Sequence, residues 1–367
     1  ALVFAVVMSL SAQIGDLFDG DEAPPGYEKL FSDVDISTVD VASEAVQPVE
    51  AAETREVEPA EKAKPRRKEA GFGPRLFGQE RLTLSVEADE VRVLVCRGQR
   101  ILRWDRAPLP SGTLRNGQVV QLEAFGEAVT TLLQQSGAPR KKAVVSLGGQ
   151  RSLVRIINMP SVSARLLDET VQRAARRELP LPLDELYLSH QVLGDRNASR
   201  LQVFLLGVPR ETMDSCVVGL RDAGVRLQAM DLKPLALVRA VNLPDVILAN
   251  LETQTESVVL VRDFVPYIVR SIAVPGESTR SAGDRAENLV AEIQRTLDFY
   301  SSTRAAEHAP WSPVVCLTGA LGDEEAVRSR LGKQWPLVEP APPLALPDGF
   351  PLLTYLVNVG LVLKRTS

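Results

Sequence analysis

The pattern of apolar and polar residues predicts a first group of strands and a helix between residues 81 and 158. Three strand-like runs come first, at 81–86, 91–96 and 100–107. Apolar residues then recur every three or four positions over 122–135, which predicts a helix that ends before Gly137. Two more strands are expected at 142–147 and 152–158. This order is typical of a mixed sheet covered by helices.

The second half of the chain repeats this order of elements. Strands are expected at 246–251, 257–261 and 265–274, followed by a helix over 284–304. The helix carries a continuous apolar stripe, because Leu289, Ile293 and Leu297 are spaced at helical intervals. A strand at 314–318 and helices at 323–331 and 352–364 complete the pattern. The repeat predicts an internally duplicated α/β body.

Residues 159–230 interrupt the first repeat with elements of their own. A helix with a buried stripe is followed by strands at 185–193 and 200–208 and by a helix at 210–223. The segment is therefore expected to form a small inserted α+β subdomain. Its first helix carries a basic face made of Arg173, Arg176 and Arg177. That face is either a solvated surface or a contact for an acidic partner, including the chain's own acidic tail.

Residues 1–77 show neither the alternation of a strand nor the 3.6-residue period of a helix. They are expected to be a disordered tail and linker. Positions 1–61 hold 14 acidic and two basic residues, and positions 62–68 hold five basic residues. Such a composition buries too little apolar surface to offset the entropy of ordering. The apolar start, residues 1–18, leaves two interpretations open: Met8 is the true initiator, or the segment docks on a membrane surface or a partner.

Charge and composition exclude several classes of function. The formal net charge is −5 and most of the acidity lies in the tail, so the nearly neutral body argues against a nucleic-acid binder. The two histidines and three cysteines form no close pair, so neither a metal module nor a disulfide framework is expected. No apolar run is long enough for a transmembrane helix.

Four blocks in the body carry a family resemblance. They are Arg177-Glu178-Leu179-Pro180-Leu181-Pro182-Leu183, Asp231-Leu232-Lys233-Pro234-Leu235, Glu292-Ile293-Gln294-Arg295-Thr296-Leu297-Asp298-Phe299-Tyr300 and Cys316-Leu317-Thr318-Gly319. In this order, within about residues 80–365, they closely resemble the type IV pilus assembly protein PilM family.

The resemblance implies an actin-like fold, a duplicated ribonuclease H-like α/β fold related to the cell-division protein FtsA, in which two lobes flank a nucleotide cleft. The expected domains are a first lobe at 78–158 joined by a C-terminal helix at 350–365, the inserted subdomain at 159–230 and a second lobe at 231–349. The resemblance also implies a cytoplasmic protein, peripheral to the inner membrane. Such a protein binds the cytoplasmic N-terminus of a PilN-like membrane protein, lies near the pilus motor ATPases and can self-associate.

The residues expected in the nucleotide cleft depart from the pattern that the resemblance implies. Ser85 and Asn250 stand where the family pattern places an aspartate for Mg²⁺, and Glu87 and Glu252 stand where it places the turn glycines. A carboxylate beside a phosphate is repelled. On the adenosine side, Thr318 and Gly319 keep the pattern, but Ala320 replaces the second glycine. We therefore expect a degenerate cleft, no catalysis, and no cofactor unless the cleft still binds ATP and Mg²⁺.

The sequence leaves two other functions open. One is an actin-like ATPase or small-molecule kinase, which would need an acid near Mg²⁺ and has only the displaced Glu87 and Glu252. The other is a GspL-like component of type II secretion, a related family whose members continue into a membrane span.

Overall fold

The computed structural model describes residues 80–148, 151–195, 198–274, 281–303 and 310–364. The expected disordered tail and the two interpretations of residues 1–18 lie outside these residues. No helix in the described ranges is long and apolar enough to cross a membrane.

The first repeat forms a five-stranded sheet. Its strands are β1 (Glu80–Val86), β2 (Glu90–Arg97), β3 (Arg100–Pro108), β6 (Ala143–Leu147) and β10 (Leu227–Leu232), in the order β10-β6-β1-β2-β3. The first three strands are antiparallel, whereas β6 runs parallel to β1. Helix α3 (Leu122–Ser136) packs against β2 and β3 after the short β4 (Leu114–Arg115) and β5 (Gln118–Val119). It ends at Gly137, whose φ of 59° is readily adopted by glycine.

The second repeat has the same pairing pattern. Strands β11 (Val246–Leu251), β12 (Thr255–Arg262), β13 (Val265–Ala273) and β14 (Val315–Thr318) form a sheet of order β13-β12-β11-β14. Again three antiparallel strands come first, and β14 is parallel to β11. The matching registers bear out the internal duplication that the sequence predicts.

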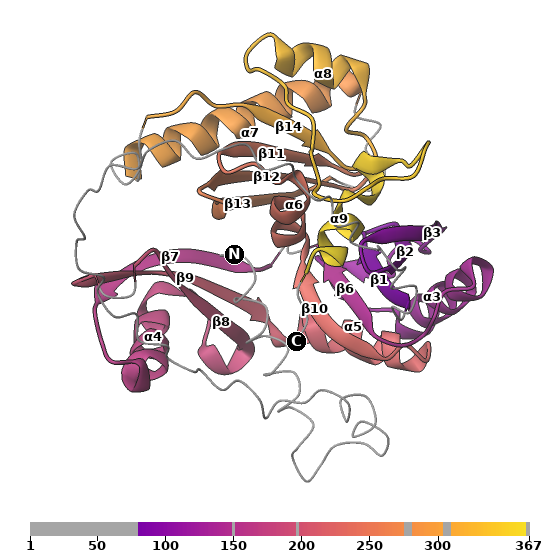
Figure 1. The fold of residues 1–367 in the computed structure, drawn as a ribbon, viewed down its shortest axis with the longest axis horizontal. Helices are drawn as coiled ribbons and strands as arrows, with labels where there is room; N and C mark the ends of the chain where they lie inside the picture. The colour runs from indigo at the N-terminus through magenta and orange to yellow at the C-terminus, as the bar shows by residue number, and fades with distance from the viewer. Residues whose placement is uncertain (1–79, 149–150, 196–197, 275–280, 304–309, 365–367) are drawn as a thin grey trace, which may run out of the picture. The chain divides into compact units, whose positions relative to one another are not determined.

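Both faces of the second sheet are covered, which explains its nearly continuous apolar strands. Ile247, Ala249 and Leu251 pack toward α7 (Ala282–Thr303) and α8 (Glu325–Gly332), which lie on one side in Figure 1. The alternate residue Leu248 packs into a core shared with the first sheet. This shared core includes α6 (Lys233–Val241) and α9 (Leu352–Val362), and both helices contact elements of both sheets.

The inserted subdomain is a three-stranded sheet with one covering helix. Strands β7 (Leu153–Pro160), β9 (Arg200–Pro209) and β8 (Leu186–Leu193) pair in that order. A short 3-10 helix, η2 (Leu183–Glu185), comes directly before β8 in the chain. Helix α4 (Ala164–Glu178) packs on the face that carries Leu201, Val203 and Leu205. The opposite face, with Phe204 and Leu206, joins the main core.

The bounds of the insert differ from those expected at 159–230. Strand β7 pairs along its length with β9 and not with the first sheet, so the inserted sheet begins at Leu153. Helix α5 (Arg210–Asp222) packs against α3, and β10 pairs with β6, so both belong structurally to the first lobe. The apolar pattern of a strand indicates a buried face but not its pairing partner, which is why the sequence misplaced these boundaries.

Candidate functional site

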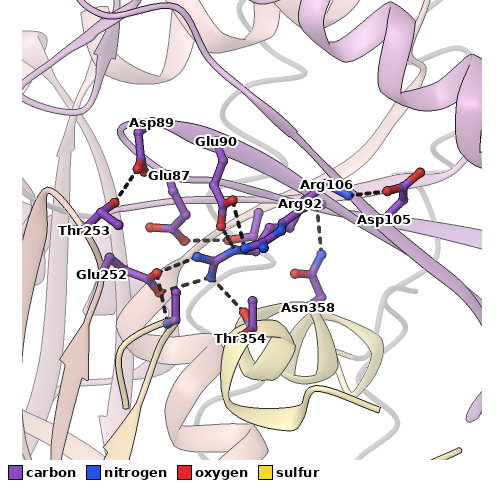
Figure 2. A network of polar contacts seen from close by, with 12 residues as sticks. Glu87, Asp89, Glu90, Arg92, Asp105, Arg106, Glu252, Thr253, Thr354 and Asn358 are labelled. Carbon is purple, nitrogen blue, oxygen red and sulfur yellow. Dashed lines mark hydrogen bonds and ion pairs between the residues drawn. The ribbon is translucent and has the colours of Figure 1, made fainter. Parts of the chain in front are cut away.

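Two equivalent hairpin turns, one from each repeat, meet in the structure. The turn between β1 and β2 carries Glu87 and Asp89, and the turn between β11 and β12 carries Glu252 and Thr253. The hydroxyl of Thr253 donates a hydrogen bond to the Asp89 carboxylate, and Figure 2 shows this contact beside the buried side chains. The duplicated fold thus brings two acidic turns together.

Arg92 of β2 reaches across to the second turn. Its Nη2 lies 2.5 Å from Glu252 Oε2, and its Nη1 donates to Glu252 Oε1 at 3.1 Å, a bidentate pair. The same guanidinium contacts Glu90 at 2.5 Å and donates to the Thr354 carbonyl oxygen of α9 at 2.7 Å. The Arg92 and Glu252 side chains are only 1% and 3% exposed, so water does not screen the pair.

Glu87 pairs with a second buried cation, Lys233 at the N-terminus of α6. The Lys233 and Glu87 side chains are 4% and 1% exposed. Ser85 donates a further hydrogen bond to Glu87 at 2.8 Å. We call Glu87, Glu90, Arg92, Lys233 and Glu252 the charge cluster.

Asn250 of β11, Thr318 of β14 and Gly319 lie beside the second turn. Asn250 donates to the Thr318 hydroxyl at 3.1 Å, and the backbone N–H of Ala320 donates to Glu252 Oε2 at 3.2 Å. Gly319 has φ +93°, and a Cβ there would lie 2.3 Å from the carbonyl oxygen of Leu251. Only glycine allows this approach. The segment after β14 therefore holds Glu252 in place.

Burial and neighbouring charges act differently on the two turn carboxylates. Loss of water would raise the pKa of Glu252, but Arg92 and then Lys233 outweigh it and hold that pKa below its ordinary value. At Glu87 burial outweighs the attraction of Lys233, so its pKa lies above the ordinary value. Burial opposes the charge of Arg92, but Glu252 reverses this effect and raises the Arg92 pKa. The pair of Arg92 and Glu252 is thus the firmly ionised contact of the site.

Residues 87–271, half of the chain, match the model of a family described as type IV pilus assembly protein PilM. The chain belongs to this family. The match includes Glu87, Arg92, Lys233 and Glu252 and the whole inserted subdomain, so the family's region and the charge cluster coincide in sequence.

Solved structures show a similar fold. A chain of a PilM-PilN type IV pilus biogenesis complex is 21% identical, with a TM-score of 0.61 and coverage of 77% of this chain and 97% of that one. The cytoplasmic domain of EpsL, an inner membrane component of the type II secretion system of Vibrio cholerae, is 12% identical over 78% of this chain and 96% of that one, with a TM-score of 0.45. A Bacteroides thetaiotaomicron protein with an actin-like ATPase fold is 10% identical over 78% and 96%, with a TM-score of 0.40. The predicted PilM resemblance and actin-like α/β fold are confirmed.

The structure brings together the six residues that the sequence places in the cleft. They are Ser85, Glu87, Asn250, Glu252, Thr318 and Gly319. Ser85 bonds to Glu87 in the first turn, and Asn250 contacts Glu252 and Thr318 at the second. Arg92 and Lys233 act on the carboxylates of both turns. Sequence reasoning missed Arg92 and Lys233. Their signal was available, because Arg92 interrupts the apolar strand 91–96 and two buried carboxylates require nearby cations.

The space beside the charge cluster is small and is lined by both polar and apolar side chains. A cavity of about 110 Å³ is lined by Glu87, Lys233, Thr255, Ser257 and Asn116 among others. Across the described ranges, no three His, Cys, Asp or Glu side chains are grouped so that they could hold a metal ion. The described site therefore offers paired charges and hydroxyl groups, not a ready set of metal ligands.

A second candidate surface lies on the inserted subdomain. Along one side of α4, Asp168, Gln172 and Arg176 recur every four residues and face Leu188 and His190 of β8. Together with neighbouring side chains they line a hollow of about 410 Å³. We call this hollow, which is lined by α4 and β8, the α4–β8 groove. Strand β8 is an edge strand of the inserted sheet.

The three predicted arginines of α4 do not share one environment. Arg176 lines the α4–β8 groove, whereas Arg173 pairs with Glu169 at 2.7 Å on the exposed side of the helix. Arg177 is exposed and does not line the groove. The structure thus separates Arg176 from the other two.

Proposed function

We propose that this chain is a non-catalytic PilM-type scaffold that binds the cytoplasmic N-terminus of a PilN-like membrane protein. In this role it would work on the cytoplasmic side of the inner membrane, as part of the pilus assembly machine and near its motor ATPases. The observation that carries the proposal is the pairing of both turn carboxylates, Glu87 and Glu252, with cations of the chain itself. Family membership supplies the pilus context.

The charge cluster disfavours a nucleotide in the cleft for two reasons. First, Glu87 and Glu252 occupy the turn positions that a phosphate would approach, so a phosphate would have to displace a carboxylate from its cation. Second, Arg92 and Lys233, which could attract phosphate, are already neutralised by carboxylates. We therefore propose that the protein requires neither ATP nor Mg²⁺.

The α4–β8 groove is the surface that we propose for the partner peptide. The groove is lined by residues of β8, an edge strand of the inserted sheet, and an extended peptide would lie in it beside this strand. Leu183 and Leu188 offer apolar contacts in the same groove, and Arg176 and Arg210 offer charge. The related PilM-PilN complex supports a PilN-like peptide as the occupant.

A peptide titration of the full chain tests this proposal. The probe is the cytoplasmic N-terminal peptide of a PilN-like protein from the same organism, measured by calorimetry with and without Mg·ATP. We expect binding that Mg·ATP does not alter. Arg176→Glu should weaken binding about tenfold, because it reverses a charge that lines the groove. Arg173→Glu, a matched change on the same helix but outside the groove lining, should alter it less than about twofold.

Two results would contradict the proposal. Equal losses for Arg173→Glu and Arg176→Glu would remove the α4–β8 groove as the peptide site. Micromolar binding of Mg·ATP itself would contradict the degenerate cleft and favour an actin-like ATPase.

A further inference from the structure

The charge cluster joins elements of different lobes through ion pairs that are mostly buried. Arg92 belongs to a strand of the first sheet, and Glu252 follows a strand of the second sheet. Lys233 begins α6, a helix that contacts both β10 and β13. Glu87, Arg92, Lys233 and Glu252 all have side chains at most 4% exposed. Buried ion pairs therefore attach the two acidic turns to the rest of the molecule.

Each buried cation depends on its carboxylate. A buried guanidinium or ammonium group that loses its counter-ion keeps its desolvation cost and gains nothing in return. Glu90 remains near Arg92 and is 16% exposed, but the bidentate contact comes from Glu252. Without Glu252, the guanidinium would face an opening next to the Ala320 N–H, a second hydrogen-bond donor.

We propose that Glu252 is a built-in anion that keeps the two hairpin turns together without any ligand, and that Arg92 with the Ala320 N–H forms a latent oxyanion site beneath Glu252. The latent site would accept a small carboxylate or phosphate once the Glu252 side chain is shortened. This inference goes beyond the proposed scaffold function, because it holds whether or not the chain binds a PilN-like peptide.

Acetate is the natural probe for the latent site. Glu252→Ala removes the terminal CH₂–COO⁻ group of the side chain, and acetate has nearly the same size, shape and charge. In the variant, acetate can accept hydrogen bonds from Arg92 Nη1 and Nη2, the atoms that contact Glu252 now. Chloride at the same ionic strength lacks this geometry, so it serves as the salt control.

Thermal unfolding of the full chain in sodium acetate and in sodium chloride, at equal ionic strength and neutral pH, tests the inference. In chloride, Glu252→Ala should lower Tm by several degrees, because Arg92 loses its bidentate partner. Acetate should restore at least half of this loss in a saturable way, and it should not shift the Tm of the unsubstituted chain. Glu287→Ala, which removes an exposed partner of Arg330, is the matched control and should respond to neither salt.

The inference is overturned if Glu252→Ala keeps the original Tm, or if acetate and chloride act alike on it. Should Glu252→Ala fail to fold, the double variant Arg92→Met/Glu252→Met decides. It removes both charges, so it should fold with a Tm near that of the original chain and without an acetate response. A double variant that is as unstable as Glu252→Ala would overturn the proposal.

Hydrogen exchange on the unsubstituted chain gives a measurement that needs no variant. Amides of 84–94 and 248–256 should exchange slowly without any ligand, and millimolar Mg·ATP should leave their rates unchanged. Exchange that is fast alone and slows several-fold with Mg·ATP would show that closing of the turns requires a ligand, and would overturn the inference.

Discussion

Lys364, two residues beyond α9, shows how strongly this interior acts on a single charge. Its side chain is 2% exposed, and its Nζ lies 3.9 Å from Asp231 Oδ2. Asp231 is at the same time bound to Arg239, whose Nε donates to the carbonyl oxygen of Gly360. Burial lowers the pKa of Lys364 to about 8, because the attraction of Asp231 only partly offsets it and Arg239 adds repulsion.

This shift predicts a pH dependence of stability with a definite sign. Between pH 8 and pH 10.5 the native state binds fewer protons at Lys364 than the unfolded chain does, so stability should rise with pH in that window. Relative to Lys364→Met, the free energy of unfolding of the original chain should increase by about 3 kcal/mol across it. Urea denaturation at several pH values measures this difference.

An exposed lysine supplies the control. Lys333→Met removes a lysine that is exposed in the native state, so it controls for the loss of one positive charge at the surface. A flat difference between the original chain and Lys364→Met would mean that Lys364 is hydrated in the native state.

At the level of residues, the sequence predicted the acidic turns but not what neutralises them. Glu87 and Glu252 stand out because they occupy turn positions where a glycine was expected. Arg92 and Lys233 lie 160 and 146 positions from their partners. Only the folded chain shows such distant pairings, so sequence reasoning could require cations without identifying them.

Among the elements, α6 and α9 approach each other so closely that a side chain at Gly360 would have less room than at any other described glycine. A Cβ added to Gly360 of α9 would lie 2.0 Å from the carbonyl oxygen of Ala236 in α6. Backbone cannot give way as a flexible side chain does, so the two helices would have to move apart. Both helices belong to the core shared by the two sheets, and a shift would spread to both lobes.

Gly360→Ala should therefore lower the free energy of unfolding by at least about 2 kcal/mol. Gly126→Ala in α3 is the matched control, since its nearest neighbour, the Gly219 carbonyl oxygen, is at an ordinary 3.6 Å. That change should be neutral or stabilise by roughly 0.5–1 kcal/mol, because alanine favours the helix. Chemical denaturation of both variants measures the contrast, and equal effects would show that α6 and α9 separate easily.

The elements also show where prediction from sequence ends. The helices at 122–135 and 284–304 match α3 and α7 to within two residues at each end, because long amphipathic periods are strong signals. Strand β7 was expected with the first sheet but pairs with β9. Helix α6 was not predicted, because it is short and buried along its whole length, and a short apolar run does not distinguish a helix from a buried strand.

For the whole molecule, a core continuous between the lobes predicts joint unfolding. One buried cluster contains residues of the first sheet, of α6 and α9, and of one face of the second sheet. Separate lobes connected by a linker would not share such a core. We therefore expect one cooperative transition, although the chain is longer than most two-state domains.

Tryptophan fluorescence can report on each lobe separately. Trp104 packs against the shared core, whereas Trp335 lies in the cluster under α7 and α8. Variants that keep only Trp104 or only Trp335, with phenylalanine at the other tryptophan positions, should unfold at the same urea concentration. Circular dichroism of the original chain provides the reference midpoint. Two distinct midpoints would show that the second lobe unfolds independently.

Because Glu252 is part of the chain, the anion that pairs with Arg92 is always present. A ligand that diffuses acts only while its concentration exceeds its dissociation constant, whereas a group attached to the chain has a fixed, high effective concentration. Arg92 pairs with Glu252 as soon as β2 and β11 have folded, and no ligand from solution is needed. On the proposed reading of the charge cluster, the arrangement of the two turns is then independent of the nucleotide pool, and a fall in cellular ATP would leave it unchanged.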